Sequence, residues 1–178
     1  MTARERILTT AFLATLLAAL TGTLLITLAQ PPAAPLNATL VEPCLYIGGR
    51  TPAPPPQTTA TLNLCERDDA YRTDIYQWSP IPDAAPAPSL DWLRTQVDFI
   101  AAQRAAGRTV FVHCNAGRSR SAMVITAYLM REHHWSADVA LQHLQAQRPV
   151  IHPIASFVTL LQNWQVSLSA PPTQPPPN

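Results

Sequence analysis

The nine-residue segment 113–121, which joins the end of a β-branched run to the start of an apolar helix, constrains this chain more than any other feature. Residues 109–113 (TVFVH) are β-branched and aromatic, which predicts a strand, and residues 119–132 predict an apolar helix. Gly117 allows the loop to turn without steric cost. The first N–H groups of a helix have no partner within it, and the helix dipole is positive there. The segment therefore predicts an anion site suited to phosphate.

Two side chains give this predicted anion site a chemistry. Cys114 begins the loop, and Arg120 follows it by six residues. A helix N-terminus and a neighbouring cation lower the pKa of a thiol from about 8.5 into the range ~3.5–7.5, which predicts a thiolate at neutral pH. The planar guanidinium of Arg120 suits two phosphate oxygens at once. A lone cysteine is more often a small buried hydrophobe, but the combination favours nucleophilic attack on phosphorus.

The rest of the middle of the chain alternates strand and helix patterns. Ser89 and Ser136 are expected to cap helices, and Gly107 and Arg148-Pro149 are expected to end them. This alternation predicts an α/β domain with a mainly parallel central sheet flanked by helices. The remaining expected strands are 45–47, 60–65 and 74–78, and a last helix is expected at 154–167.

The two ends of the chain have a different composition. Residues 1–29 contain an uncharged run of 23 residues, Ile7–Ala29, and a spanning helix needs roughly 20. We expect a single-pass N-terminal transmembrane anchor or an uncleaved signal segment, with membrane contact through residues 7–29; a cleaved signal peptide is the alternative. The side of the membrane on which the domain lies stays open. A proline-rich linker (30–38), the domain (39–168) and a disordered proline-rich tail (169–178) are expected to follow.

The charge of the domain excludes one class of partner. From Thr39 to Leu168 the chain has ten arginines and ten acidic residues, and it has no lysine. Nucleic-acid binding depends on clustered positive charge, so we expect no nucleic-acid partner.

The string Cys114 to Arg120 resembles the signature of the protein tyrosine phosphatase superfamily. With His113 before it and Ser121 after it, the loop is similar to that of the dual-specificity phosphatases. The resemblance implies the corresponding fold, with no metal or organic cofactor. Weaker similarities lie at Leu45–Gly48, Leu62–Leu64, Pro82-Asp83 and Arg148–Phe157.

The resemblance also implies a role for each residue of the loop. Cys114 is the expected nucleophile, Arg120 binds phosphate, Ser121 supports departure of the thiolate, and His113 helps to set the thiol pKa. The remaining members of the phosphate-binding loop are Asn115, Ala116, Gly117, Arg118 and Ser119. One departure is Pro153-Ile154, where the family often has Pro-Asn, so an asparagine that supports the loop is absent.

Two further residues are candidates for roles at the site. The leaving oxygen needs a general acid, and Asp83, in the proline-rich loop 31 residues before Cys114, is where the family places it. Asp74 and Asp91 are the other upstream acids. Cys65 matches the strand in which some relatives hold a redox partner of the nucleophile. A Cys44–Cys65 disulfide and two free thiols are the alternatives.

These expectations lead to phosphate monoester hydrolysis through a cysteinyl-phosphate intermediate. The first substrate class is proteins with phosphotyrosine, phosphoserine or phosphothreonine. The alternative is a phospholipid head group, a phosphatidylglycerophosphate or a phosphoinositide. A non-catalytic phosphate-binding module is a third reading, against which stand the intact Cys114, Arg120 and Asp83.

Overall fold

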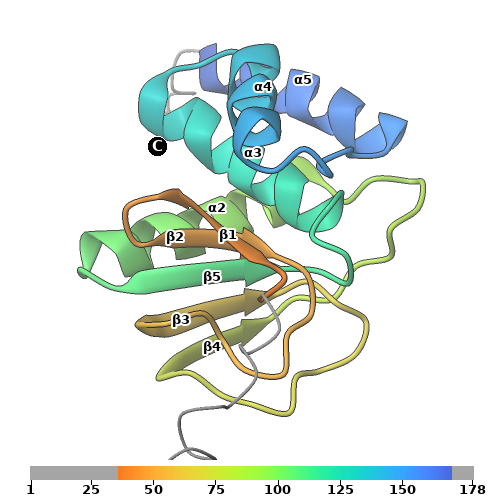
Figure 1. Ribbon diagram of the computed structural model, residues 1–178. Coiled ribbons are helices and arrows are strands. Elements are labelled where there is room, and N and C mark those ends of the chain that lie inside the picture. The colour runs from red at the N-terminus through yellow and green to blue at the C-terminus, as the bar shows by residue number, and fades with distance from the viewer. Residues whose placement is uncertain (1–35, 170–178) are drawn as a thin grey trace, which may run out of the picture. The chain divides into compact units, whose positions relative to one another are not determined.

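The computed structural model describes residues 36–169, which form a five-stranded sheet and four helices (Figure 1). The strand order is β1-β2-β5-β3-β4, and only the β1–β2 pair is antiparallel. The predicted α/β class with a mainly parallel sheet is therefore confirmed. The elements in chain order are β1 (Ala38–Glu42), β2 (Leu45–Gly48), β3 (Thr58–Asn63), β4 (Ile75–Trp78), α2 (Leu90–Ala105), β5 (Thr109–His113), α3 (Arg120–His133), α4 (Ala137–Gln147) and α5 (Ala155–Ser169).

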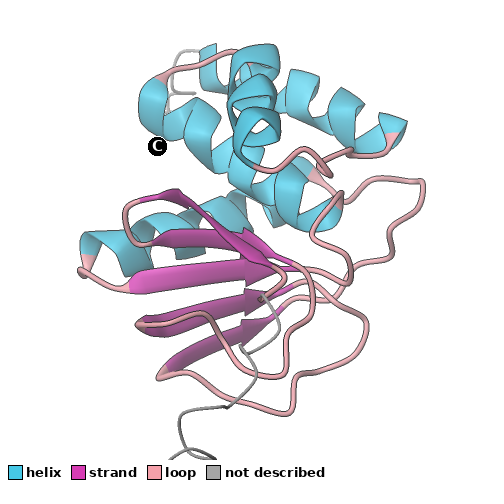
Figure 2. Cartoon of the chain, in the orientation of Figure 1, coloured by secondary structure: helices cyan, strands magenta, loops and turns pink. Residues whose placement is uncertain are grey.

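The parallel register brings the carboxyl ends of four strands to one edge of the sheet. His113 at the end of β5 pairs with Gly48 of β2 on one side and with Asn63 of β3 on the other. Asn63 in turn pairs with Trp78 of β4. Figure 2 shows these strand ends pointing to the edge where the long loops lie. Ligands of open parallel sheets bind at this edge.

The hydrophobic core lies between the sheet and the helices. In β5, Val110 and Val112 are fully buried in the same cluster as apolar residues of all four helices. Helices α2 and α3 pack on the sheet and on each other, and α4 and α5 pack on α3. Phe111 and His113 alternate with the two valines and so point to the opposite face. The segment between β3 and β4 bonds to His113 there.

The helix ends follow the local chemistry expected from the sequence. The Ser89 hydroxyl accepts a hydrogen bond from Trp92 N, and the Ser136 hydroxyl accepts one from Val139 N. Gly107 has a φ of 74°, a left-handed conformation that glycine adopts without strain. Trp164 of α5 is fully buried in the core.

Strand β1 was not predicted, and three predicted segments fall wholly or mostly outside the described residues. The anchor at 7–29 lies entirely outside the described residues. Most of the linker (30–38) and nearly all of the tail (169–178) also lie outside them. Within residues 36–169, none of the helices has the length and apolar character needed to cross a bilayer.

One alternative from the sequence, a Cys44–Cys65 disulfide, is wrong. Cys44 precedes β2, and its neighbour Leu45 lies level with Val110 and Ala60 in the sheet. Cys65 is five residues beyond Ala60, on the order of 15 Å further along the strands. A disulfide requires Cα atoms within about 7 Å. All three cysteines are free thiols.

Candidate active site

The predicted loop leaves the carboxyl end of β5 at Cys114 and enters α3 at Arg120. The backbone N–H of Cys114 donates to Gly48 O (3.2 Å), and Leu64 N donates to His113 O (2.9 Å). These bonds fix the start of the loop between the ends of β2 and β3. The Cys114 side chain is 1% exposed, at the base of the loop.

The surroundings of Cys114 favour its thiolate. Burial opposes ionisation, but the Ser121 hydroxyl, the backbone N–H groups of Ser121 and Gly117, and the charge of Arg120 outweigh it and hold the pKa of Cys114 below its ordinary value. The Cys114 Sγ and Ser121 Oγ atoms lie 3.4 Å apart. The structure thus brings together the residues expected to act as nucleophile and to stabilise the thiolate.

Arg120 is buried beside Cys114, and only its Nη1 donates to carbonyl groups of the described chain. Its Nη1 donates to Ile81 O (2.9 Å) and Leu64 O (3.4 Å). Its buried Nε has no hydrogen-bond partner among the described residues. A buried donor without a partner is costly in the absence of a ligand. The arrangement therefore leaves Nε available to an anion while backbone carbonyls hold the guanidinium in place.

Two carboxylates lie close to Arg120. An Asp83 oxygen is 3.9 Å from Arg120 Nε, and a Glu66 oxygen is 3.5 Å from Arg120 Nη1. The Asp83 side chain is 39% exposed and that of Glu66 is 65% exposed. The predicted acid is thus brought to the mouth of the loop, whereas Glu66 was not singled out from the sequence. Asp91, another of the acidic residues considered from the sequence as the general acid, lies in the first turn of α2.

The conformation of the loop depends on Gly117 and Arg148. Gly117 has a φ of 67°, and a Cβ there would lie 2.4 Å from the carbonyl carbon of Gly48. Arg148 Nε donates to Gly117 O (3.0 Å), and its Nη2 donates to Ala116 O (3.3 Å) and to Asn37 Oδ1. Sequence reasoning named Arg148 as a helix end and as the start of a weak family similarity, and gave it no role at the loop. Its guanidinium supports the loop by donating to two of the loop's backbone carbonyl oxygens.

Ser119 makes a contact where the asparagine of the family is absent. Its hydroxyl accepts a hydrogen bond from Ile154 N (3.3 Å). Arg118 O accepts another from His152 N (2.8 Å). The segment after α4 is therefore tied to the loop through Ser119 and the backbone rather than through an asparagine side chain.

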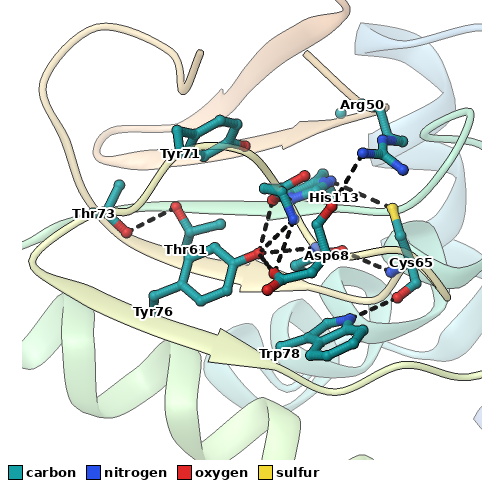
Figure 3. A network of polar contacts seen from close by, with 12 residues as sticks. Arg50, Thr61, Cys65, Asp68, Tyr71, Thr73, Tyr76, Trp78 and His113 are labelled. Carbon is teal, nitrogen blue, oxygen red and sulfur yellow. Dashed lines mark hydrogen bonds and ion pairs between the residues drawn. The ribbon is translucent and has the colours of Figure 1, made fainter. Parts of the chain in front are cut away.

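His113 has partners other than the Cys114 thiol. Its Nδ1 lies 3.7 Å from Cys65 Sγ (Figure 3). Its Nε2 lies 2.8 Å from Asp69 Oδ2, and its ring stacks on Phe111. Asp69 in turn accepts from the Tyr76 hydroxyl (3.0 Å). The buried imidazole thus belongs to a polar network under the loop, and the groups that chiefly lower the pKa of Cys114 are those named above.

The remaining loop residues face the surface. Asn115, Ala116 and Arg118 are exposed, and Arg118 Nε donates to Val150 O (3.2 Å). A pocket of about 620 Å³, lined by Arg50, Glu66, Arg67 and Asn115, adjoins the loop. Between residues 36 and 169, no cluster of three His, Cys, Asp or Glu side chains has the arrangement of a metal site.

This geometry agrees with the family of known proteins that the chain matches. Residues 56–167 match the family model described as the dual specificity phosphatase catalytic domain. The chain belongs to this family. It is 36% identical to human dual specificity protein phosphatase 1 over 115 residues, which are 64% of this chain and 31% of that protein. The chain thus spans about a third of the length of the curated relatives that it matches first.

Solved structures of dual-specificity phosphatases have the same fold. A mouse putative dual specificity phosphatase complexed with zinc tungstate superposes with a TM-score of 0.72 at 31% identity, covering 79% of this chain and 94% of that one. Human DUSP28 superposes with a TM-score of 0.70 at 28% identity, covering 79% of this chain and 100% of that one.

Proposed function

We propose that this dual-specificity phosphatase domain hydrolyses phosphate monoesters on proteins, at phosphotyrosine and at phosphoserine or phosphothreonine. The observation that supports this most directly is the buried Cys114 thiol, whose pKa is lowered by Ser121, by backbone N–H groups and by Arg120 in the loop between β5 and α3. The mouse relative that was crystallised with zinc tungstate adds support, because tungstate is a tetrahedral oxyanion like phosphate.

The proposed reaction has two steps, both using residues of this chain. The Cys114 thiolate attacks phosphorus, the ester P–O bond breaks, and the protonated Asp83 carboxyl gives its proton to the leaving oxygen. Water then attacks the cysteinyl phosphate, Asp83 accepts a proton from it, and the S–P bond breaks to restore the thiolate. Arg120 and the loop N–H groups bind the equatorial oxygens throughout, and Ser121 stabilises the departing thiolate.

The test is phosphate release by the full chain in detergent, without added metal. A phosphotyrosine peptide, a phosphothreonine peptide and an aryl phosphate are the substrates, with Cys114→Ser as the control. We expect turnover of all three by the wild-type chain and background release by the mutant. Binding of phosphopeptide without turnover would instead support the non-catalytic phosphate-binding module.

A phospholipid head-group phosphatase is the second candidate. The observation that favours it is the uncharged run Ile7–Ala29, since a membrane anchor of this length would hold the domain near lipid. Phosphatidylglycerophosphate and phosphoinositide micelles belong in the same assay. Turnover of a lipid with no turnover of either peptide would replace the protein substrate by a lipid one. Carbonate extraction of membranes from cells expressing the chain with and without residues 1–29 tests the anchor.

A further inference from the structure

A polar pocket beside the phosphate loop has no role in the chemistry described so far. Its volume is about 620 Å³, and its lining residues are Arg50, Glu66, Arg67 and Asn115. Asn115 belongs to the loop itself, directly after Cys114. A group in this pocket would therefore lie next to the phosphate that the loop holds.

Arg50 is held in a fixed position relative to the loop. Its backbone N–H donates to Asn115 O (3.1 Å). Gly49 packs so closely that a Cβ there would lie 2.9 Å from the same oxygen. Among residues 36–169, the Arg50 side chain donates only to the backbone carbonyl of Asp68 (3.1 Å), a contact drawn in Figure 3. Its guanidinium is thus positioned by neutral partners and keeps donors for an anion.

Arg67 also lines the pocket, and its segment is fixed by Asn63. The Asn63 carboxamide accepts from Cys65 N (2.7 Å) and donates to Arg67 O (3.3 Å). The Arg67 side chain is exposed, and within residues 36–169 it makes no hydrogen bond and no ion pair. Its charge is therefore unbalanced by a direct partner.

The two aspartates that follow Arg67 bond elsewhere. Asp68 accepts from Arg72 and from the Tyr76 hydroxyl (2.7 Å). Asp69 bonds to His113 and Tyr76; it is within electrostatic reach of Arg50 but makes no ion pair with it. Figure 3 shows Tyr76, Asp68 and His113 together in this network. The network thus occupies Asp68 and Asp69. Glu66, the acidic residue that lines the pocket, lies 3.5 Å from Arg120 Nη1, so the pocket keeps two arginines against one carboxylate.

We propose that Arg50 and Arg67 bind a second acidic group of the substrate, the carboxylate or phosphate of a side chain that flanks the phosphorylated residue of a peptide. This inference rests on the proposed phosphatase function. Guanidinium groups suit carboxylates and phosphates because their donors form a planar fork. A peptide is favoured over a lipid as the source, since the family to which the chain belongs and the matched human relative are those of dual-specificity phosphatases.

The test compares two phosphotyrosine peptides with the full chain. One peptide has Asp and Glu on both sides of the phosphotyrosine, and the other has Asn and Gln at the same positions. We expect Arg50→Gln and Arg67→Gln each to lower kcat/KM for the acidic peptide about fivefold, as for the loss of one partly exposed ion pair. The loss appears in KM, because the contact is the same in ground and transition states. The neutral peptide and an aryl phosphate change less than about twofold.

Arg108→Gln is the matched control. Arg108 precedes β5, at the opposite edge of the sheet, so the variant removes the same charge far from the pocket. We expect it to behave as the wild-type chain with both peptides. Binding of the two peptides to the Cys114→Ser chain gives a readout that does not depend on turnover.

The outcomes separate the inference from the proposed function. Two results overturn the inference and leave the proposed function intact. In the first, the wild-type chain hydrolyses the aryl phosphate and has the same kcat/KM for both peptides. In the second, both arginine variants keep the preference for the acidic peptide. A wild-type chain that hydrolyses none of the substrates overturns the function. A third result would show that the second acidic group comes from a lipid and not from a peptide. In that case the chain prefers a lipid with two phosphates, this preference depends on the two arginines, and the two peptides are hydrolysed equally.

Discussion

The contact between Ser121 and Cys114 determines where in the pH range the proposed nucleophile is ionised. Because the Ser121 hydroxyl lowers the pKa of Cys114, its removal raises that pKa. We expect the acidic limb of the kcat/KM profile of Ser121→Ala to move to higher pH, with a loss of about tenfold on that limb, since a hydrogen bond to a charged group is worth about 1.5–3 kcal/mol. A pH profile with an aryl phosphate measures it. Ser167→Ala, on α5, is the control, and superimposable profiles of the two variants would contradict this role.

If Asp83 is the general acid, substitutions of the two carboxylates near Arg120 should have different effects on activity. Asp83→Asn should slow hydrolysis of an alkyl phosphate by about 10²–10⁴-fold, because its poor leaving group needs a proton. An aryl phosphate with a good leaving group should be affected far less. Glu66→Gln, which removes the other carboxylate, should match the wild-type chain on both. If Glu66→Gln shows the leaving-group dependence and Asp83→Asn does not, the role belongs to Glu66.

Cys65 is the proposed redox partner of Cys114. Burial, with the charges of Cys114 and Asp69, raises the pKa of Cys65 to about 12, so it stays a thiol at neutral pH. Peroxide would oxidise the Cys114 thiolate to a sulfenic acid, and Cys65 would then form a disulfide with it by loss of water. We expect peptide mapping after peroxide treatment to show this disulfide. In Cys65→Ser, Cys114 should proceed to the sulfinic acid, with activity that dithiothreitol does not restore. Absence of the disulfide in the wild-type chain would reject the switch.

At the scale of elements, substitution of two glycines with the same left-handed backbone conformation distinguishes the cost of backbone strain from the cost of a steric clash. Gly117 and Gly107 have φ of 67° and 74°, but a Cβ at Gly117 would overlap Gly48, whereas nothing lies within 4 Å at Gly107. Both alanine variants should lose about 1 kcal/mol of unfolding free energy from the left-handed backbone. Only Gly117→Ala should also lose phosphate binding, because its loop must move. Denaturant unfolding and competitive inhibition by phosphate check the two effects, and intact inhibition in Gly117→Ala would contradict the crowding.

The elements differ in how far the sequence predicts them. Strand β5 and the loop after it were predicted because their signals are local, a β-branched run and a cysteine and arginine six residues apart. Strand β1 was missed because its half-exposed residues lack a clear pattern, and it is a strand only through its pairing with β2. The role of Arg148 was missed for a similar reason. Its partners Gly117 and Asn37 lie 31 and 111 residues away in the chain, a separation that no local pattern reports.

At the scale of the whole molecule, the buried Asp69–His113 pair links stability to pH. Burial raises the pKa of Asp69, but hydrogen bonds from His113 and Tyr76 and nearby positive charge outweigh it, and the pKa is lowered overall. The stabilisation is therefore fully present above the unfolded value of about 3.9 and is lost as pH falls through the folded value.

Asp69→Asn should thus reduce the fall in unfolding free energy with acidification. It should also cost about 1–3 kcal/mol at neutral pH, since it weakens a buried charged hydrogen bond. Urea unfolding from pH 7 to pH 3 measures both effects. Asp74→Asn, at an exposed position just before β4, is the control. An equal pH dependence in the Asp69 variant and the wild-type chain would contradict the linkage.

The exposed cysteine and the two buried cysteines lie at opposite edges of the sheet. Cys44, the one exposed cysteine of the three, lies in the turn between β1 and β2, at the edge opposite the phosphate loop, whereas Cys65 and Cys114 are buried. A maleimide dye or a surface linker would therefore react at Cys44 first. A chain tethered in this way would present its phosphate loop outward, in one orientation, to substrates in the solution above.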